Sequence, residues 1–136
     1  MIVLAHFVID HIIASIYGIT FILVGISHFR NPQIFVEIVP PFLPFALFLV
    51  YLSGAMEIAG GFGLIYPGSR EITGRLLVIF LIMVFPANLY MWIGDVPFDG
   101  TLLTTQQHML RAGFQVVLII VALYLSGDLA KFSQSI

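Results

Sequence analysis

The sequence predicts an all-α integral membrane protein, with four transmembrane helices in an up-and-down bundle. Of its 136 residues, 60% are hydrophobic and only 9% are charged, and its mean hydropathy is +1.10. A soluble domain averages about 25% charged residues. Four apolar blocks are each long enough to cross roughly 30 Å of hydrocarbon. Strands with open edges would leave backbone groups unsatisfied in lipid, so we interpret all four blocks as helices.

The predicted helices follow the apolar blocks, and the whole chain, residues 1–136, forms a single domain. The helices cover approximately residues 12–29, 43–66, 72–92 and 106–126. Short connections make consecutive helices antiparallel neighbours, with both termini on one side of the membrane. Arg70, Arg75 and Lys131 share the side of the termini, whereas Arg30 and Arg111 lie on the other. This three-to-two split favours cytoplasmic termini.

The first helix carries two glycines on one face and a histidine at the end of that face. Gly18 and Gly25 are seven residues apart, and His28 follows three residues later. All three residues therefore lie on one face of the helix. The residues before the helix lack the basic region and the cleavage site of a secretory signal, so we expect them to run into the first helix.

A proline-rich segment separates the first and second helices. Pro40, Pro41 and Pro44 remove backbone hydrogen-bond donors and forbid a continuous helix. We therefore expect this segment to lie along the membrane interface, with its apolar residues in the headgroup boundary and Glu37 toward water.

The second helix contains the clearest polar centre, because Glu57 is its only charged residue. An ionised carboxylate at this depth costs on the order of 2.5 to 3.5 kcal/mol on insertion scales, so we expect Glu57 to face other helices. Ala55, Ala59 and Gly63 are spaced four residues apart. We expect this stripe of small residues to be the surface on which another helix packs.

The third and fourth helices carry polar side chains near their non-terminal ends. Pro86 is expected to kink the third helix, and Asn88 follows it at membrane depth. The fourth helix presents His108, Arg111 and Gln115 at positions i, i+3 and i+7. These three residues form one polar stripe that enters the membrane.

Five polar residues form the candidate site for ligand binding or proton handling. They are His28, Glu57, Asn88, Arg111 and Gln115. We expect Glu57 to meet Arg111 between the helices, with the two amides beside them. The cluster could be a polar network that fixes the register of the bundle, each interaction contributing about 0.6 to 2 kcal/mol. It could instead line a cavity that binds a ligand or relays protons. No catalytic residue is assigned.

The composition argues against several other chemistries. With no cysteine, the chain cannot form a thiol-disulfide relay, a thiolate-held iron–sulfur cluster or a cysteine zinc site. A net charge of −2 with scattered basic residues argues against nucleic acid as a partner. His6 and His11 do not share a helix face, so we expect no metal site there. Haem would need His28 and His108 to face each other across helices, and we do not expect it.

Four segments of the chain resemble the DoxX-like family of small four-helix membrane proteins. They are GISHFRNPQIFVEIVPPFLP, YLSGAMEIAGGFGLIYPGSR, VFPANLYMW and RAGFQVVLI, which together extend over nearly the whole chain. The most specific motifs are His28-Phe29 before a proline, IVPP at 38–41, SG-x-x-E at 53–57 and PAN at 86–88. Arg111 and Gln115 also match, although Ala112-Gly113-Phe114 replaces a proline that the family often has between them.

The resemblance implies the four-helix fold and a link to membrane complexes, without a single shared reaction. Such proteins are associated with respiratory or thiosulfate-to-quinone oxidoreductases, with oxidative-stress detoxification and with the assembly of membrane proteins. We therefore expect a small integral subunit of a quinone-linked redox system, more a part of an oxidoreductase complex than an enzyme by itself. Its polar centre would border a pocket for a quinone or a lipid-like ligand.

The alternative is a non-catalytic accessory or assembly subunit, in which Glu57 and Arg111 only fix the register of the helices. In both cases the expected partners are the lipid bilayer and either a larger membrane protein complex or further copies of the chain. A carrier or channel is a weaker hypothesis, because one four-helix unit contains no inverted repeat.

Overall fold

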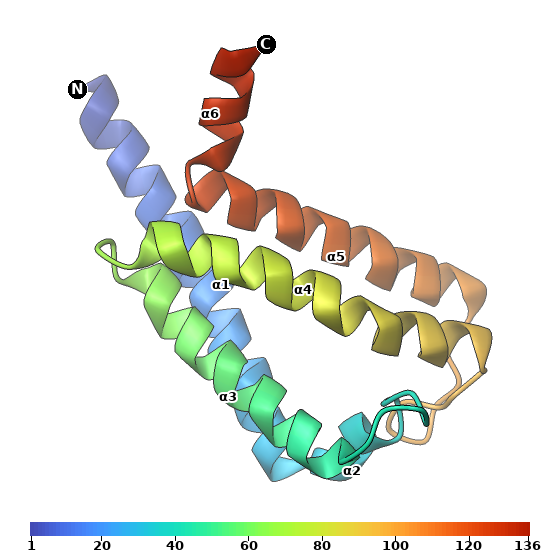
Figure 1. The fold of residues 1–136 in the computed structure, drawn as a ribbon. Coiled ribbons are helices and arrows are strands. Elements are labelled where there is room, and N and C mark those ends of the chain that lie inside the picture. The colour runs from blue at the N-terminus through green and yellow to red at the C-terminus, as the bar shows by residue number, and fades with distance from the viewer.

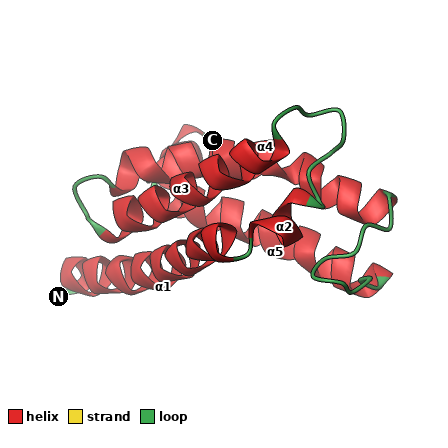
Figure 2. Ribbon diagram, turned by 90° about the horizontal axis from the view of Figure 1, so that it is seen from below, coloured by secondary structure: helices red, strands yellow, loops and turns green.

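The computed structural model describes residues 1–136, which form six helices and no strand (Figure 1). The helices are α1 (Ile2–Arg30), α2 (Pro32–Val36), α3 (Ala46–Ile65), α4 (Arg70–Ile93), α5 (Thr105–Leu125) and α6 (Asp128–Ser135). Helices α1, α3, α4 and α5 are long and apolar enough to cross a membrane, which confirms the predicted all-α membrane fold. The irregular segments are confined to the connections (Figure 2).

The helix bounds differ from the predicted ones mainly at the two ends of the chain. Helix α1 begins at Ile2 rather than near residue 12, because residues 2–11 are mostly apolar and contain no glycine or proline that would interrupt a helix. Helix α3 begins after Pro44 and after Phe45, which has a left-handed backbone with φ of 58°. Helix α6 was not predicted, since its eight residues are mostly polar.

The four long helices form two antiparallel pairs, α1 with α3 and α4 with α5. The pairs converge where α3 turns into α4 and spread apart toward α2, and both chain termini lie at the convergent end (Figure 1). We call the end where α3 turns into α4 the shared end, and the end near α2 the open end. Termini on one side agree with the predicted up-and-down connections.

The buried core lies toward the shared end and draws on all four long helices. Its members are Ala14, Tyr17, Phe21, Leu64, Leu77, Phe80, Leu81, Ala122 and Leu125. The Tyr17 hydroxyl donates a hydrogen bond of 3.1 Å to the Leu118 carbonyl and so joins α1 to α5. Only 24 of the 136 residues are buried, so most apolar side chains face the surrounding lipid.

Helices α1 and α3 make backbone contact through two pairs of glycines. A Cβ atom at Gly18 would lie 2.5 Å from the Gly61 carbonyl oxygen, and one at Gly25 would lie 2.6 Å from that of Gly54. Real Cβ atoms essentially never come this close. Gly18 and Gly25, which the sequence places on one face of the helix, therefore form the surface of α1 that packs on α3.

The predicted packing stripe on the second helix is wrong at Ala55 and Ala59, which are exposed. It is confirmed only at Gly63, where Thr73 of α4 packs closely. The reason is steric, because a glycine pair lets backbones touch whereas an alanine keeps them a methyl group apart. Helix α1 therefore packs on the face of α3 that carries the glycines.

Candidate functional site

The five predicted site residues are divided between the two helix pairs. His28 and Glu57 lie together on α1 and α3, while Asn88, Arg111 and Gln115 lie together on α4 and α5. His28, Asn88 and Arg111 lie near the ends of their helices on the non-terminal side, whereas Glu57 and Gln115 lie about halfway along α3 and α5.

The first group is a histidine–carboxylate pair. The Nδ1 atom of buried His28 lies 2.9 Å from the Val24 carbonyl oxygen and 3.2 Å from Glu57 Oε2. Both oxygens are acceptors, so Nδ1 carries the proton. Its single hydrogen is directed to the closer carbonyl, which leaves buried Glu57 Oε2 without a hydrogen-bond partner. This oxygen can accept a hydrogen bond from a bound molecule.

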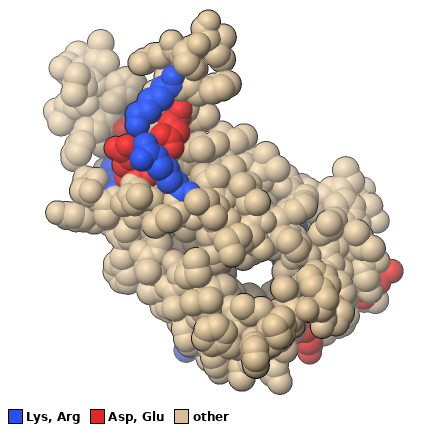
Figure 3. Space-filling model, in the orientation of Figure 1, with Lys and Arg blue, Asp and Glu red and all other residues tan.

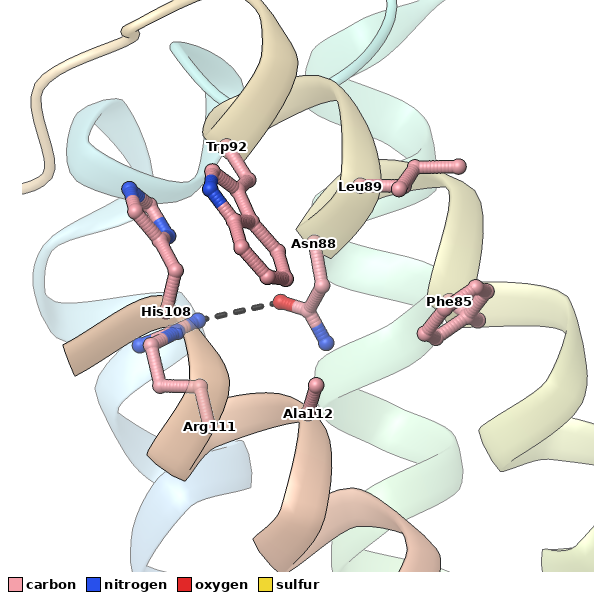
Figure 4. Close-up of a pocket in the computed structure, with 7 residues that line it drawn as sticks. All are labelled: Phe85, Asn88, Leu89, Trp92, His108, Arg111 and Ala112. Atoms are coloured by element: carbon pink, nitrogen blue, oxygen red, sulfur yellow. Dashed lines mark hydrogen bonds between the residues drawn. The ribbon is translucent and has the colours of Figure 1, made fainter. Parts of the chain in front are cut away.

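The second group is a chain of side-chain hydrogen bonds. Arg111 Nη2 donates to Asn88 Oδ1 at 3.0 Å (Figure 4). Asn88 Nδ2 donates to Gln115 Oε1 at 2.6 Å, and Gln115 Nε2 donates to the Leu81 carbonyl at 2.6 Å. Leu81 lies in α4, five residues before Pro86. Arg111 Nε is buried and has no partner.

The predicted ion pair between Glu57 and Arg111 is wrong. Glu57 contacts His28, whereas Arg111 is bonded to Asn88. The physical reason is the divergence of the helix pairs, because α3 packs directly on α1 while α5 belongs to the other pair. The expectation that Glu57 faces other helices is confirmed, since its side chain is only 13% exposed.

Two phenylalanines connect the groups, and neither was predicted. Phe35 of α2 stacks on the His28 ring, with centroids 3.7 Å apart, and meets Phe98 edge-on at 5.6 Å. The Arg111 guanidinium carbon lies 5.5 Å from the centre of the Phe98 ring, in cation–π range. The only sequence signal for this contact is that both connections on the non-terminal side contain phenylalanine, which makes an aromatic contact between them possible.

Phe98 reaches this position from a tight turn in the connection between α4 and α5. Phe98 and Thr101 exchange backbone hydrogen bonds of 3.0 and 3.1 Å, and Asp99 and Gly100 between them have positive φ angles of 52° and 74°. Such a turn favours glycine and tolerates aspartate. The turn thus fixes where Phe98 points.

Space remains between the helix pairs. Figure 3 shows an opening through the molecule on the side away from α6. A cleft of about 230 Å³ also lies between α3 and α4, and its lining is mostly apolar. It is lined by Met56, Ala59, Gly60, Thr73, Leu76, Leu77 and Phe80.

A smaller pocket lies between α4 and α5, beside the hydrogen bond of Arg111 to Asn88 (Figure 4). Its volume is about 30 Å³, the space that one water molecule occupies in the liquid. Trp92 and His108 stack at its edge, with ring centroids 5.5 Å apart. His108 is therefore part of the α4–α5 pair and packs on an aromatic ring.

A further polar cluster at the shared end was missed by the sequence analysis. Buried Arg70 donates to the Leu64 and Ile65 carbonyls at 2.7 and 3.0 Å and approaches His11 Nδ1 at 3.1 Å. Arg70 thereby satisfies free carbonyls at the end of α3, where a cation is favourable. This role is structural. No group of three or more His, Asp or Glu residues is placed to hold a metal ion.

The comparison with known families gives one match, described as Domain of unknown function (DUF8561), over residues 17–126. This range contains all five predicted site residues. No curated protein and no solved structure matches the chain. Nothing in the match links the chain to the DoxX-like family, so that resemblance stays a prediction.

Proposed function

The chain belongs to the DUF8561 family, whose description assigns no activity, and we propose that it is a small integral membrane subunit that binds an amphipathic molecule between its two helix pairs. In this proposal the polar head of the molecule lies between Glu57 and Arg111, and its apolar tail lies in the cleft between α3 and α4. The bound molecule is a quinone in its reduced quinol form, whose hydroxyl groups both donate and accept hydrogen bonds, and the subunit serves a quinone-linked redox system.

One observation carries the proposal, namely that two buried polar atoms of opposite character lack partners. Glu57 Oε2 is an acceptor on one helix pair, and Arg111 Nε is a donor on the other. An unsatisfied buried polar group costs about 1–3 kcal/mol. A head group that donates to the carboxylate and accepts from the guanidinium would satisfy both atoms.

The surroundings of these two atoms suit an aromatic or planar head. Phe35 stacks on His28, and Phe98 lies against Arg111 and meets Phe35 edge-on, so an aromatic ring stands beside each of the two groups. The cleft between α3 and α4 is apolar and lies in the membrane-spanning part of the chain. Ligand sites of this kind combine an apolar lining with a few polar groups.

The redox association rests on the resemblance to DoxX-like proteins. The residues of this chain contribute binding and orientation, and the His28–Glu57 pair can hold or release a proton next to the head group. Electron transfer would belong to the bound molecule and to a partner complex.

The test is to identify and quantify what the protein retains on purification. After isolation from its native membrane in a mild detergent, the protein is extracted with organic solvent and the extract is analysed by chromatography and mass spectrometry. We expect a stoichiometric quinone that is lost in Glu57→Gln and kept in Glu71→Gln, a control at an exposed carboxylate of α4. A phospholipid in place of the quinone would reject the redox association, and an empty protein would reject ligand binding.

The second candidate function, an accessory or assembly subunit, is favoured by the N-terminal part of α1. Residues 2–9 are all exposed, and this part of α1 projects past the shared end without a neighbouring helix (Figure 1). Its large apolar residues include Leu4 and Phe7, which are 66% and 55% exposed. Exposed apolar surface of this kind is typical of a protein contact.

This alternative predicts co-purification with a partner at a fixed ratio. The variant Leu4→Ser/Phe7→Ser should release the partner while the isolated chain stays folded and retains its quinone. Isolation of the native chain as a stable monomer would speak against the accessory role.

A further inference from the structure

Helix α6 is a separate feature that the proposed function does not use. It begins three residues after α5 ends, with only Ser126 and Gly127 between the two helices. Gly127 has a left-handed backbone with φ of 78°, which favours glycine. The chain turns sharply at this point, so that α6 points away from the axis of α5 (Figure 1).

The apolar side chains of α6 fall on one side of the helix. Leu129, Phe132 and Ile136 are at positions i, i+3 and i+7, with Ile136 directly after the last helical residue. Lys131 and Gln134 lie on the opposite side. Leu129 is half-buried, whereas Phe132 is 65% exposed and Ile136 is 92% exposed, so the chain leaves most of this apolar face uncovered.

The polar side of α6 is tied to the first turns of α4 by ion pairs. Arg75 donates to both carboxylate oxygens of Asp128 at 2.9 Å, and Lys131 reaches Glu71 at 3.2 Å. Arg75 also donates to Glu71 at 2.7 Å. Figure 3 shows these charges gathered where α6 meets the rest of the molecule. Two cations and two carboxylates neutralise one another in this cluster, which we call the α6 ion cluster.

We propose that α6 is a membrane-surface anchor, whose apolar face lies in the boundary between the headgroups and acyl chains of the bilayer that the long helices span. The argument is one of continuity, because α5 is a membrane-spanning helix and α6 follows it after two residues. An amphipathic helix at this level buries its apolar face about 5–10 Å into the headgroup boundary. The neutral ion cluster ties the first turn of α6 to α4, and the exposed Gln134 further along the polar side is then directed to water while the apolar side meets lipid.

The absence of cysteine from the chain permits a direct test by site-directed spin labelling. Single variants Phe132→Cys and Ile136→Cys place a nitroxide on the apolar face, and Gln134→Cys is the matched control on the polar face. The labelled full chain is reconstituted into phosphatidylcholine vesicles. Power saturation then measures collisions of each label with oxygen, which partitions into lipid, and with a water-soluble nickel chelate.

The proposal expects the ratio of oxygen to nickel collisions to be about five-fold higher at positions 132 and 136 than at 134. Equal ratios at all three positions would place the apolar face in water and overturn the proposal. Protection of position 132 from both reagents would also overturn it, because another protein surface would then cover this face. Unchanged elution on size exclusion and an unchanged far-ultraviolet spectrum show that each labelled protein is folded, and two apolar positions keep the test decisive if one variant misfolds.

Discussion

His28 is the ionisable side chain that lies against Glu57, with Nδ1 3.2 Å from Glu57 Oε2. The sequence alone identified both residues as members of one site, because ionisable side chains within apolar spans are few and need partners. It could not show which residues pair, since that depends on which helices pack together. The glycine faces of α1 and α3 decide this, and they bring His28 rather than Arg111 to Glu57.

The contact between His28 and Glu57 predicts that replacing His28 alone destabilises the protein more than replacing both residues. His28→Phe keeps a ring that can stack on Phe35 but removes the Nδ1 proton near Glu57. We expect a loss of about 1–3 kcal/mol in the free energy of unfolding, because the polar imidazole edge that lies 3.2 Å from the carboxyl group is replaced by an apolar ring. Thermal unfolding in detergent measures this loss.

The double variant His28→Phe/Glu57→Met is the control for that experiment. Replacing both partners by apolar groups of similar size removes the unsatisfied carboxyl, so most of the lost stability should return. If the two single losses simply add in the double variant, the residues are not coupled and the assigned contact is wrong.

At the scale of the elements, the apolar runs defined the four long helices, and the short helices escaped prediction. Helix α2 contains five residues and α6 contains eight, so neither shows a convincing hydrophobic period. The position of α6 depends on the partners of Asp128 on another helix, which no local pattern reveals. The start of α1 was missed because no N-cap or proline signal near Ile2 marks where the helix begins.

The contact between α1 and α3 predicts opposite outcomes for two glycine substitutions. Gly18→Ala would place a Cβ atom against the Gly61 carbonyl, so we expect a loss of about 1–3 kcal/mol in unfolding free energy. Gly113→Ala on α5 meets nothing within 4 Å and should be neutral or slightly stabilising. Unfolding by a denaturing detergent compares the two variants, and equal effects would contradict the close glycine packing.

The α6 ion cluster predicts a defined pH dependence. Hydrogen bonds from Arg75 lower the pKa of Asp128 from 3.8 to about 2. A carboxyl group with a lowered pKa stabilises the folded state above its unfolded pKa and loses this contribution as the pH falls through the folded value. The attachment of α6 should therefore be constant from neutral pH to about pH 4 and weaken between about pH 4 and pH 2.

The mobility of a spin label at Ala130→Cys reports this attachment during an acid titration. We expect the label to become mobile only below about pH 4. Asp128→Asn should give a mobile label at every pH. Release near neutral pH in the otherwise unchanged chain would contradict the ion pair with Arg75.

At the scale of the whole molecule, the sequence predicted the fold class but not the divergence of the helix pairs. Apolar length and short connections suffice to predict four antiparallel spans. The opening depends on how Phe35 and Phe98 meet across two connections, and neither connection has a periodic pattern. The candidate residues were therefore predicted more completely than their arrangement.

The aromatic contact at the open end predicts that Phe98 limits the separation of the pairs. Phe98→Ala removes the edge contact with Phe35 and the ring that lies under Arg111. Spin labels at Phe48→Cys on α3 and Leu89→Cys on α4 should then show a longer and broader distance distribution by pulsed electron resonance. Phe114→Ala, at an exposed position of α5, should leave the distribution unchanged.

Occupancy of the space between Glu57 and Arg111 is the central claim, and native mass spectrometry of the protein released from its own membrane tests it most directly. We predict one bound small molecule per chain in the unchanged protein and in Glu71→Gln, and none in Glu57→Gln/Arg111→Met. A bare chain mass for the unchanged protein, or an adduct that survives in the double variant, would contradict the account.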